Sequence, residues 1–117
     1  MTNRATERRL FELHARTCRV LAHSTRLALI EALRSGEHSV TELVDTVGTT
    51  AANLSQHLAA MRDAGVVAAR REGRYAYYRI SDPRILKAFH LMREVLMGRL
   101  DRDAELARRA GWGGARR

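Results

Sequence analysis

Side chains that pair with the edges of nucleic-acid bases fall within one short segment, residues 50–57. Asn53 and Gln56 carry amides that pair bidentately with adenine, and the hydroxyl of Ser55 bonds to several bases. The small Ala52 would allow close approach of a helix, and the free N–H groups of a helix start near Thr50 would hold a phosphate. The predicted base-reading set is therefore Thr50, Ala52, Asn53, Ser55, Gln56 and His57. The alternative is that these residues are the solvated side of an amphipathic helix.

A second group of residues, arginines around a glycine, suits the binding of phosphate. Arg70 and Arg71 precede Gly73 and Arg74 follows it, so three guanidinium groups gather near the tip of a predicted hairpin. A guanidinium binds phosphate oxygens in bidentate geometry, and a hairpin can carry it to the phosphates or into the minor groove. We therefore predict that Arg70, Arg71 and Arg74 contact DNA. A phosphate-binding hairpin close to residues 50–57 in the sequence favours a DNA-reading role for those residues over the alternative of a solvated helix face.

The single cysteine of the chain, Cys18, offers a different chemistry. A lone thiol cannot close a disulfide within its own chain, so it is either a small packing residue or a sensor. Positive charge from Arg16 and Arg19 would favour the thiolate, which reacts with oxidants and reactive sulfur species and binds arsenite. Both interpretations of Cys18 stay open at this level.

Helical spacing gives a further candidate, a metal site. His14 and Cys18 are four residues apart, so they would share one face of a helix. His90 and Glu94 have the same spacing near the other end of the chain. If the two helices packed together, four ligands of types suited to zinc would converge, and the protein would bind a metal ion or metalloid. The alternative is that both histidines are surface or packing residues.

Helices must position these residues, and the spacing of apolar side chains predicts where they lie. Apolar residues recur every three or four positions over 6–22, which predicts a first helix with a wide apolar face. So broad a face needs a cover, and in a small chain a second subunit can supply it. A second helix is expected over 25–35, with Ser24 as its N-cap and Gly36 at its end.

A helix-turn-helix is predicted next. Ser39 and Glu42 match the S-x-x-E capping box, in which hydroxyl and carboxylate satisfy free backbone N–H groups, so a short third helix should cover 40–47. Gly48 supplies the sharp turn before a fourth helix over 50–63.

The pattern then changes from helical to β-prone. Short β-prone runs at 66–71 and 75–80, separated by a glycine-containing tip, predict a hairpin. A last helix should start with Pro83 at its first position, capped by Ser81 or Asp82. The predicted fold class is mainly α with a β-hairpin wing, a winged helix-turn-helix whose order is four helices, two strands and one helix.

Composition limits the class of protein. The chain has 117 residues and a formal net charge of +8, which favours a polyanionic partner, although a GC-rich genome also raises arginine content. This length fits one domain, so we expect a DNA-binding and dimerisation domain over 1–100 and a basic, flexible tail over 101–117. No run is apolar enough for a membrane span or signal segment, so a cytoplasmic protein is expected. No nucleophile with its base, phosphate loop or carboxylate pair is recognisable, so we expect no enzyme.

From about residue 10 to residue 100 the sequence resembles the ArsR/SmtB repressors. The resemblance is carried by the segments LAHSTRL (21–27), SVTEL (39–43), NLSQHL (53–58), RDAGVV (62–67), RREGR (70–74) and YYRI (77–80). It implies a transcriptional repressor that forms a homodimer through its first and last helices. It further implies that the dimer binds an inverted repeat in double-stranded operator DNA and leaves it when an inducer is sensed.

The metal-binding motifs of that family are largely missing. The cysteines that metal-sensing members carry after Glu-Leu are absent here, where residues 44–47 read VDTV. Of the family's other ligand set, on the last helix, only Asp82 matches. We therefore expect a thiol-reactive inducer, namely reactive sulfur, an oxidant or arsenite, acting at Cys18. The alternatives are a metal-responsive repressor that uses the non-standard set His14, Cys18, His90 and Glu94, or a repressor with no inducer at Cys18.

Overall fold

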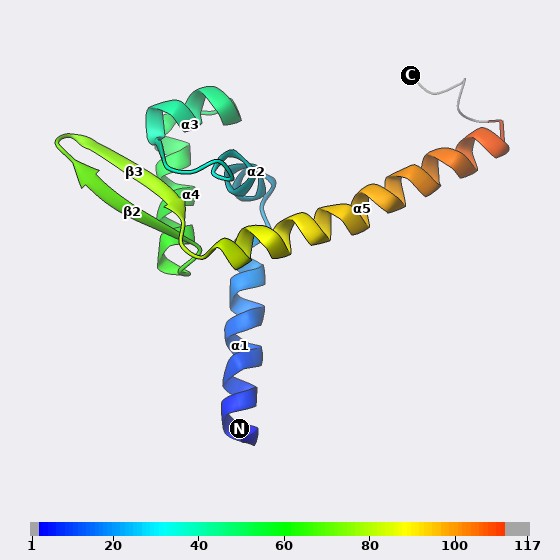
Figure 1. Ribbon diagram of the computed structural model, residues 1–117, viewed down its shortest axis with the longest axis horizontal. Helices are drawn as coiled ribbons and strands as arrows, with labels where there is room; N and C mark the ends of the chain where they lie inside the picture. Colours follow the sequence, from blue (N-terminus) through cyan, green and yellow to red (C-terminus); the bar gives the residue numbers. More distant parts are fainter. Residues whose placement is uncertain (1–2, 112–117) are drawn as a thin grey trace. The chain divides into compact units, whose positions relative to one another are not determined.

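The computed structural model describes residues 3–111 and divides into two compact units, the first ending at Leu86 and the second beginning at Lys87. Helix α5 (Pro83–Arg109) starts in the first unit and supplies the helix of the second. The other elements all lie in the first unit (Figure 1): α1 (Arg4–Leu21), α2 (Ser24–Ala32), β1 (His38–Ser39), α3 (Val40–Val47), α4 (Ala51–Asp63), β2 (Val67–Glu72) and β3 (Tyr75–Ile80). This order confirms the predicted class, mainly α with a β-hairpin.

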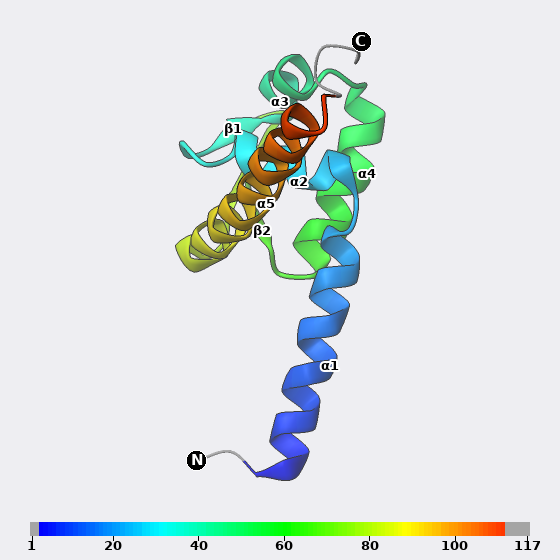
Figure 2. The same ribbon diagram turned by 90° about the vertical axis from the view of Figure 1, so that its right-hand side faces the viewer.

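Helix α1 has an apolar face that the rest of its unit does not cover. Asn3 caps the helix by accepting a hydrogen bond from the backbone N–H of Thr6 at 2.8 Å. None of its residues is buried, and Leu10 and Phe11 are 59% and 67% exposed. Both views show the N-terminal turns of α1 extending away from α2, α3 and α4 (Figures 1 and 2).

Helix α2 differs from its prediction at both ends. Its N-cap is His23 and not Ser24, which is already helical, and the His23 side chain makes no capping bond. The helix ends at Ala32, before the predicted residue 35, because the chain turns through Gly36, at φ +128°, to bring β1 alongside β3. The expectation that Ser24 caps α2 was therefore wrong.

The helix-turn-helix is formed by α3 and α4, as predicted. Ser39 and Glu42 make the reciprocal capping box at the start of α3, and Gly48 ends that helix in the left-handed region at φ +81°. Around these helices lies the core, whose side chains are almost completely shielded from solvent: Leu29, Ile30, Leu33, Leu43, Leu54, Leu58, Met61, Val66 and Val67. Each such side chain contributes about 1.5–3 kcal/mol by leaving water.

The hairpin belongs to a sheet with one strand more than the sequence indicated. Strand β3 pairs antiparallel with β2 and also with the two-residue β1, so the order is β1-β3-β2. Two residues are too few for a period-two pattern, and for that reason β1 was not predicted. The extra strand connects the hairpin to the start of α3.

Helix α5 starts as predicted and runs further than predicted. Asp82 accepts a hydrogen bond from the backbone N–H of Arg84 at 2.9 Å, and the Arg84 side chain lowers the pKa of Asp82 to about 2. The helix continues past Leu100, where we expected a tail, to Arg109, because residues 104–109 are good helix formers and Glu105 pairs with Arg109 at 3.0 Å. The last part of the predicted tail, 112–117, lies outside the described residues.

Over residues 3–111 we find no helix with the length and apolarity needed to cross a membrane.

Candidate nucleic-acid interface

The first turn of α4 is held by side chains of the base-reading set itself. The Thr50 hydroxyl caps the helix by accepting from the backbone N–H of Asn53 at 3.1 Å. The Asn53 amide in turn donates to the Thr49 hydroxyl at 3.1 Å. Thr50 and Asn53 therefore help to build the helix start, and the Asn53 side chain is only partly exposed.

The two faces of α4 differ sharply in exposure. Leu54 and Leu58 are fully buried, whereas Ala52, Ser55 and Gln56 are exposed. Positions three and four apart share a helix face, so the last three residues form one small, uncharged and hydrogen-bonding surface. This surface has the chemistry needed to read base edges.

His57 occupies a different place on α4, against the helices that precede it. Its Nδ1 accepts a hydrogen bond from Nε of Arg26 at 2.9 Å, and Nη1 of Arg26 donates to the carbonyl of Val20 at 2.7 Å. The His23 ring lies 5.8 Å from the His57 ring. Burial, followed by the charges of Arg26 and His23, lowers the pKa of His57, so its neutral form is favoured. Sequence reasoning missed Arg26, which is 31 positions from His57 and had no local signal.

The wing, defined as the hairpin β2–β3, turns at Gly73, which has φ +64°. Arg71 and Arg74 are exposed, and within residues 3–111 neither forms an ion pair. Their guanidinium groups are therefore available to an anionic partner.

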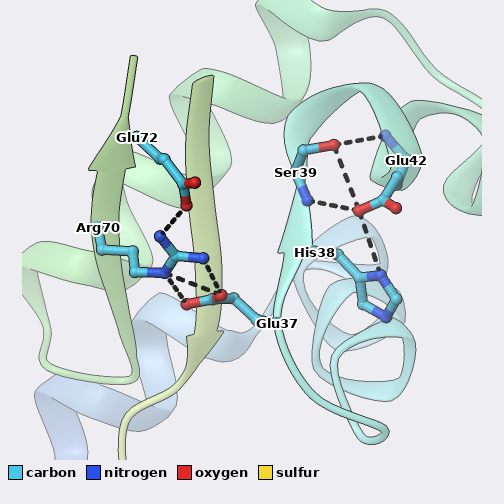
Figure 3. A network of polar contacts seen from close by, with 6 residues as sticks. All are labelled: Glu37, His38, Ser39, Glu42, Arg70 and Glu72. Atoms are coloured by element: carbon cyan, nitrogen blue, oxygen red, sulfur yellow. Dashed lines mark hydrogen bonds and ion pairs between the residues drawn. The ribbon is translucent and has the colours of Figure 1, made fainter. Parts of the chain in front are cut away.

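Arg70 has a different environment from its two neighbours in the wing (Figure 3). Its Nε lies 2.9 Å from both carboxylate oxygens of Glu37, and its Nη1 lies 2.6 Å from Glu72 Oε1. The guanidinium carbon also lies 4.8 Å from the centre of the Tyr77 ring. Hydrogen bonds from Arg70 lower the pKa of Glu37 and keep that carboxylate charged. We call Glu37, Arg70, Glu72 and Tyr77 the Arg70 cluster.

The sensing candidates lie on α1 and α5, and not on α4 or the wing. Cys18 is exposed on α1, so within the single chain it is not the buried packing residue of one interpretation. His14 shares α1 with Cys18, and His90 and Glu94 share α5 in the other unit. Within residues 3–111, no three His, Cys, Asp or Glu side chains are grouped so as to hold a metal ion. The four-residue metal set stays a prediction.

Comparisons with known proteins agree on one family. The family model described as bacterial regulatory protein, arsR family, matches residues 23–69, which cover α2 to the start of the wing. The chain is 42% identical over 88 residues to an uncharacterised HTH-type transcriptional regulator of Mycobacterium tuberculosis, Rv0081, covering 74% of this chain and 77% of that one. It is also 37% identical over 82 residues to the biofilm growth-associated repressor of Xylella fastidiosa, covering 70% of this chain and 71% of that protein.

Solved structures give the same result. The crystal structure of Rv0081 superposes with a TM-score of 0.73 at 40% identity, over 81% of this chain and 96% of that chain. A solution structure from Mycobacterium bovis is described as a homodimeric winged helix-turn-helix DNA-binding domain of a possible ArsR-family regulator. It superposes with a TM-score of 0.72 at 30% identity, over 92% of this chain and 93% of that chain. These relatives are transcriptional regulators and not enzymes, as the sequence led us to expect. The chain belongs to the arsR family of bacterial regulatory proteins.

Proposed function

We propose that this protein is a transcriptional repressor that binds operator DNA, with α4 in the major groove and the wing on the flanking phosphates. The observation that carries the proposal is the exposed surface of Ala52, Ser55 and Gln56, set directly after a capped helix-turn-helix. Small and neutral hydrogen-bonding side chains fit base edges, and the start of the second helix is the part that enters the groove. Arg71 and Arg74 supply phosphate contacts beside it.

The active form in this proposal is a homodimer. Helices α1 and α5 each carry large apolar side chains that are 43% to 67% exposed: Leu10, Phe11 and Leu13 on α1, and Leu91, Met92, Val95, Leu96, Met97 and Leu100 on α5. A contiguous apolar surface left in water is unfavourable by about 25 cal/mol per Å², so a second copy of the chain is a suitable cover. The homodimeric relative from M. bovis supports this assignment. Two-fold symmetry then predicts an inverted-repeat operator.

A salt titration of binding to the protein's own promoter tests the proposal. A repressor of this kind should bind the promoter with an affinity that falls steeply as the salt concentration rises. Part of the binding should be specific to the operator, so that competitor DNA does not remove it. Replacing Ser55 and Gln56 together with Ala should abolish the preference for the operator. Arg71→Ala with Arg74→Ala should weaken operator and competitor DNA alike. If the operator preference survives loss of Ser55 and Gln56, α4 is not the base-reading helix.

We further propose that a thiol-reactive inducer, either reactive sulfur, an oxidant or arsenite, releases the operator by acting at Cys18. The exposure of Cys18 on a helix whose apolar face lacks a cover in the single chain supports this step. The experiment compares operator release by reduced, peroxide-treated, polysulfide-treated and arsenite-treated protein with a matched Cys18→Ser variant. Zinc-loaded protein tests the metal alternative at His14, Cys18, His90 and Glu94. Release by a thiol reagent that is unchanged in Cys18→Ser would contradict the proposal.

A further inference from the structure

The Arg70 cluster connects parts of the fold that are not neighbours in the sheet. Arg70 is on β2 and Glu37 lies just before β1, on the far side of the middle strand β3. In the register of the sheet Arg70 is opposite Tyr77, and Tyr77 is opposite Ser39. The Arg70 side chain therefore extends over the Tyr77 ring to reach Glu37. Figure 3 shows the contact between Arg70 and Glu37 across the sheet.

This cross-strand pair lies next to the start of the helix-turn-helix. Glu37 is two residues before Ser39, the N-cap of α3. The backbone N–H of Ser39 donates to Glu42 Oε1 at 2.8 Å, and the backbone N–H of Glu42 donates to the Ser39 hydroxyl at 3.2 Å. The ion pair of Arg70 thus holds the wing to a residue only two positions before the cap of α3, and the backbone of residues 37–39 connects the two.

The charge of Arg70 is already matched inside the protein. Its guanidinium meets two carboxylates, those of Glu37 and Glu72, so the cluster as a whole is not positive. If Arg70 turned towards a phosphate, Glu37 would remain as an unpaired carboxylate beside the DNA strand, and like charges repel. Arg71, one residue on, projects from the other face of β2 and carries no such pair.

We propose that Arg70 and Glu37 fix the wing relative to the helix-turn-helix, and that Arg70 is a positioning residue for DNA binding and not a phosphate contact. This inference rests on the proposed DNA-binding function. It separates three neighbouring arginines: Arg71 and Arg74 contact phosphate, while Arg70 sets where they point.

Two glutamates of the cluster supply a matched test. Glu37→Gln and Glu72→Gln each remove one negative charge that faces Arg70, but only Glu37 reaches it from outside the wing. Binding of each variant to operator DNA is measured across a salt series. We expect Glu37→Gln to weaken binding by about two- to five-fold at every salt concentration, on the scale of one exposed ion pair, with an unchanged salt slope. Glu72→Gln should leave binding unchanged or slightly tighter, because it removes a negative charge near the wing tip.

The arginines supply the second part of the test. Arg71→Gln should reduce the salt slope by about 0.9 for each phosphate that the side chain no longer neutralises. Arg70→Gln should weaken binding as much as Glu37→Gln does, and it should change the salt slope less than Arg71→Gln does. The double variant Glu37→Gln with Arg70→Gln should bind no more weakly than either single variant. Tighter binding and a steeper slope in Glu37→Gln would show that Glu37 withholds a phosphate-binding Arg70, and would overturn the proposal. Binding equal to that of the unchanged protein would overturn it too.

A measurement without DNA separates this inference from the proposed function. Amide hydrogen exchange in the free protein should be faster over Glu72, Gly73 and Arg74 in Glu37→Gln and not in Arg71→Gln. Unchanged exchange in Glu37→Gln refutes the positioning role, whether or not the protein binds DNA. If the unchanged protein binds no DNA but the exchange is faster, the proposed function fails and the structural part of this inference stands.

Discussion

Two adjacent residues of α4, Leu54 and Ser55, should respond to alanine in opposite ways. Leu54 is 0% exposed, and its replacement by Ala leaves a cavity between α4 and the rest of the core. Such a change costs about 2–5 kcal/mol, a large share of the roughly 5–15 kcal/mol that stabilises a domain of this size. Ser55 faces solvent, so Ser55→Ala should change the free energy of unfolding by less than about 0.5 kcal/mol.

Urea unfolding at one fixed protein concentration measures both variants, because association also affects the midpoint. With a slope of about 2 kcal/mol per molar urea, Leu54→Ala should lower the midpoint by about 1–2.5 M. Ser55→Ala should leave the midpoint in place and reduce the preference for operator over competitor DNA. If Ser55→Ala unfolds earlier and Leu54→Ala does not, α4 is rotated relative to the structure and its exposed face has been misassigned.

Two further predictions concern residues that hold the helix-turn-helix. Ser39→Ala should cost about 0.5–2 kcal/mol by removing the capping hydroxyl of α3, as measured by the same urea midpoint, while Thr41→Ala, exposed in the first turn of α3, serves as its control. Because the pKa of His57 lies below its usual value of 6.5, the stability that neutral His57 contributes should be fully present above about pH 6.5 and lost as the pH falls through the lowered pKa. His57→Asn keeps an acceptor for Arg26 without titrating, so its unfolding midpoint should fall less between pH 7 and pH 5; an identical fall in both proteins would contradict this role.

Most of the fold could be predicted because its signals are local. The capping box of Ser39 and Glu42 spans three positions, and the turn at Gly48 needs only one residue that tolerates positive φ. Helix α4 has buried residues at Leu54, Leu58 and Met61, a spacing that is visible in the sequence. Where one residue type and a short spacing determine the local backbone geometry, the sequence is sufficient to predict the element.

Side-chain contacts between polar residues far apart in the sequence could not be predicted in this way. Arg26 meets His57 across 31 positions, and Arg70 meets Glu37 across 33. Periodicity tells which face a side chain occupies but not which residue from another element faces it. The base-reading set was therefore predicted as one group, although His57 hydrogen-bonds to Arg26 while Ser55 and Gln56 face solvent.

Net charge therefore does not show which arginines are available to DNA. The formal charge of +8 sums all charged residues, and it does not tell that Arg70 is occupied by two carboxylates. The exposed face of α4 contributes no charge at Ala52, Ser55 or Gln56. In the proposed complex, then, the uncharged face of α4 supplies sequence preference, and unpaired wing arginines supply affinity that depends on salt. Because the two contributions arise from different elements, variants on α4 should change the choice of site with little effect on the salt slope, while loss of Arg71 should do the reverse.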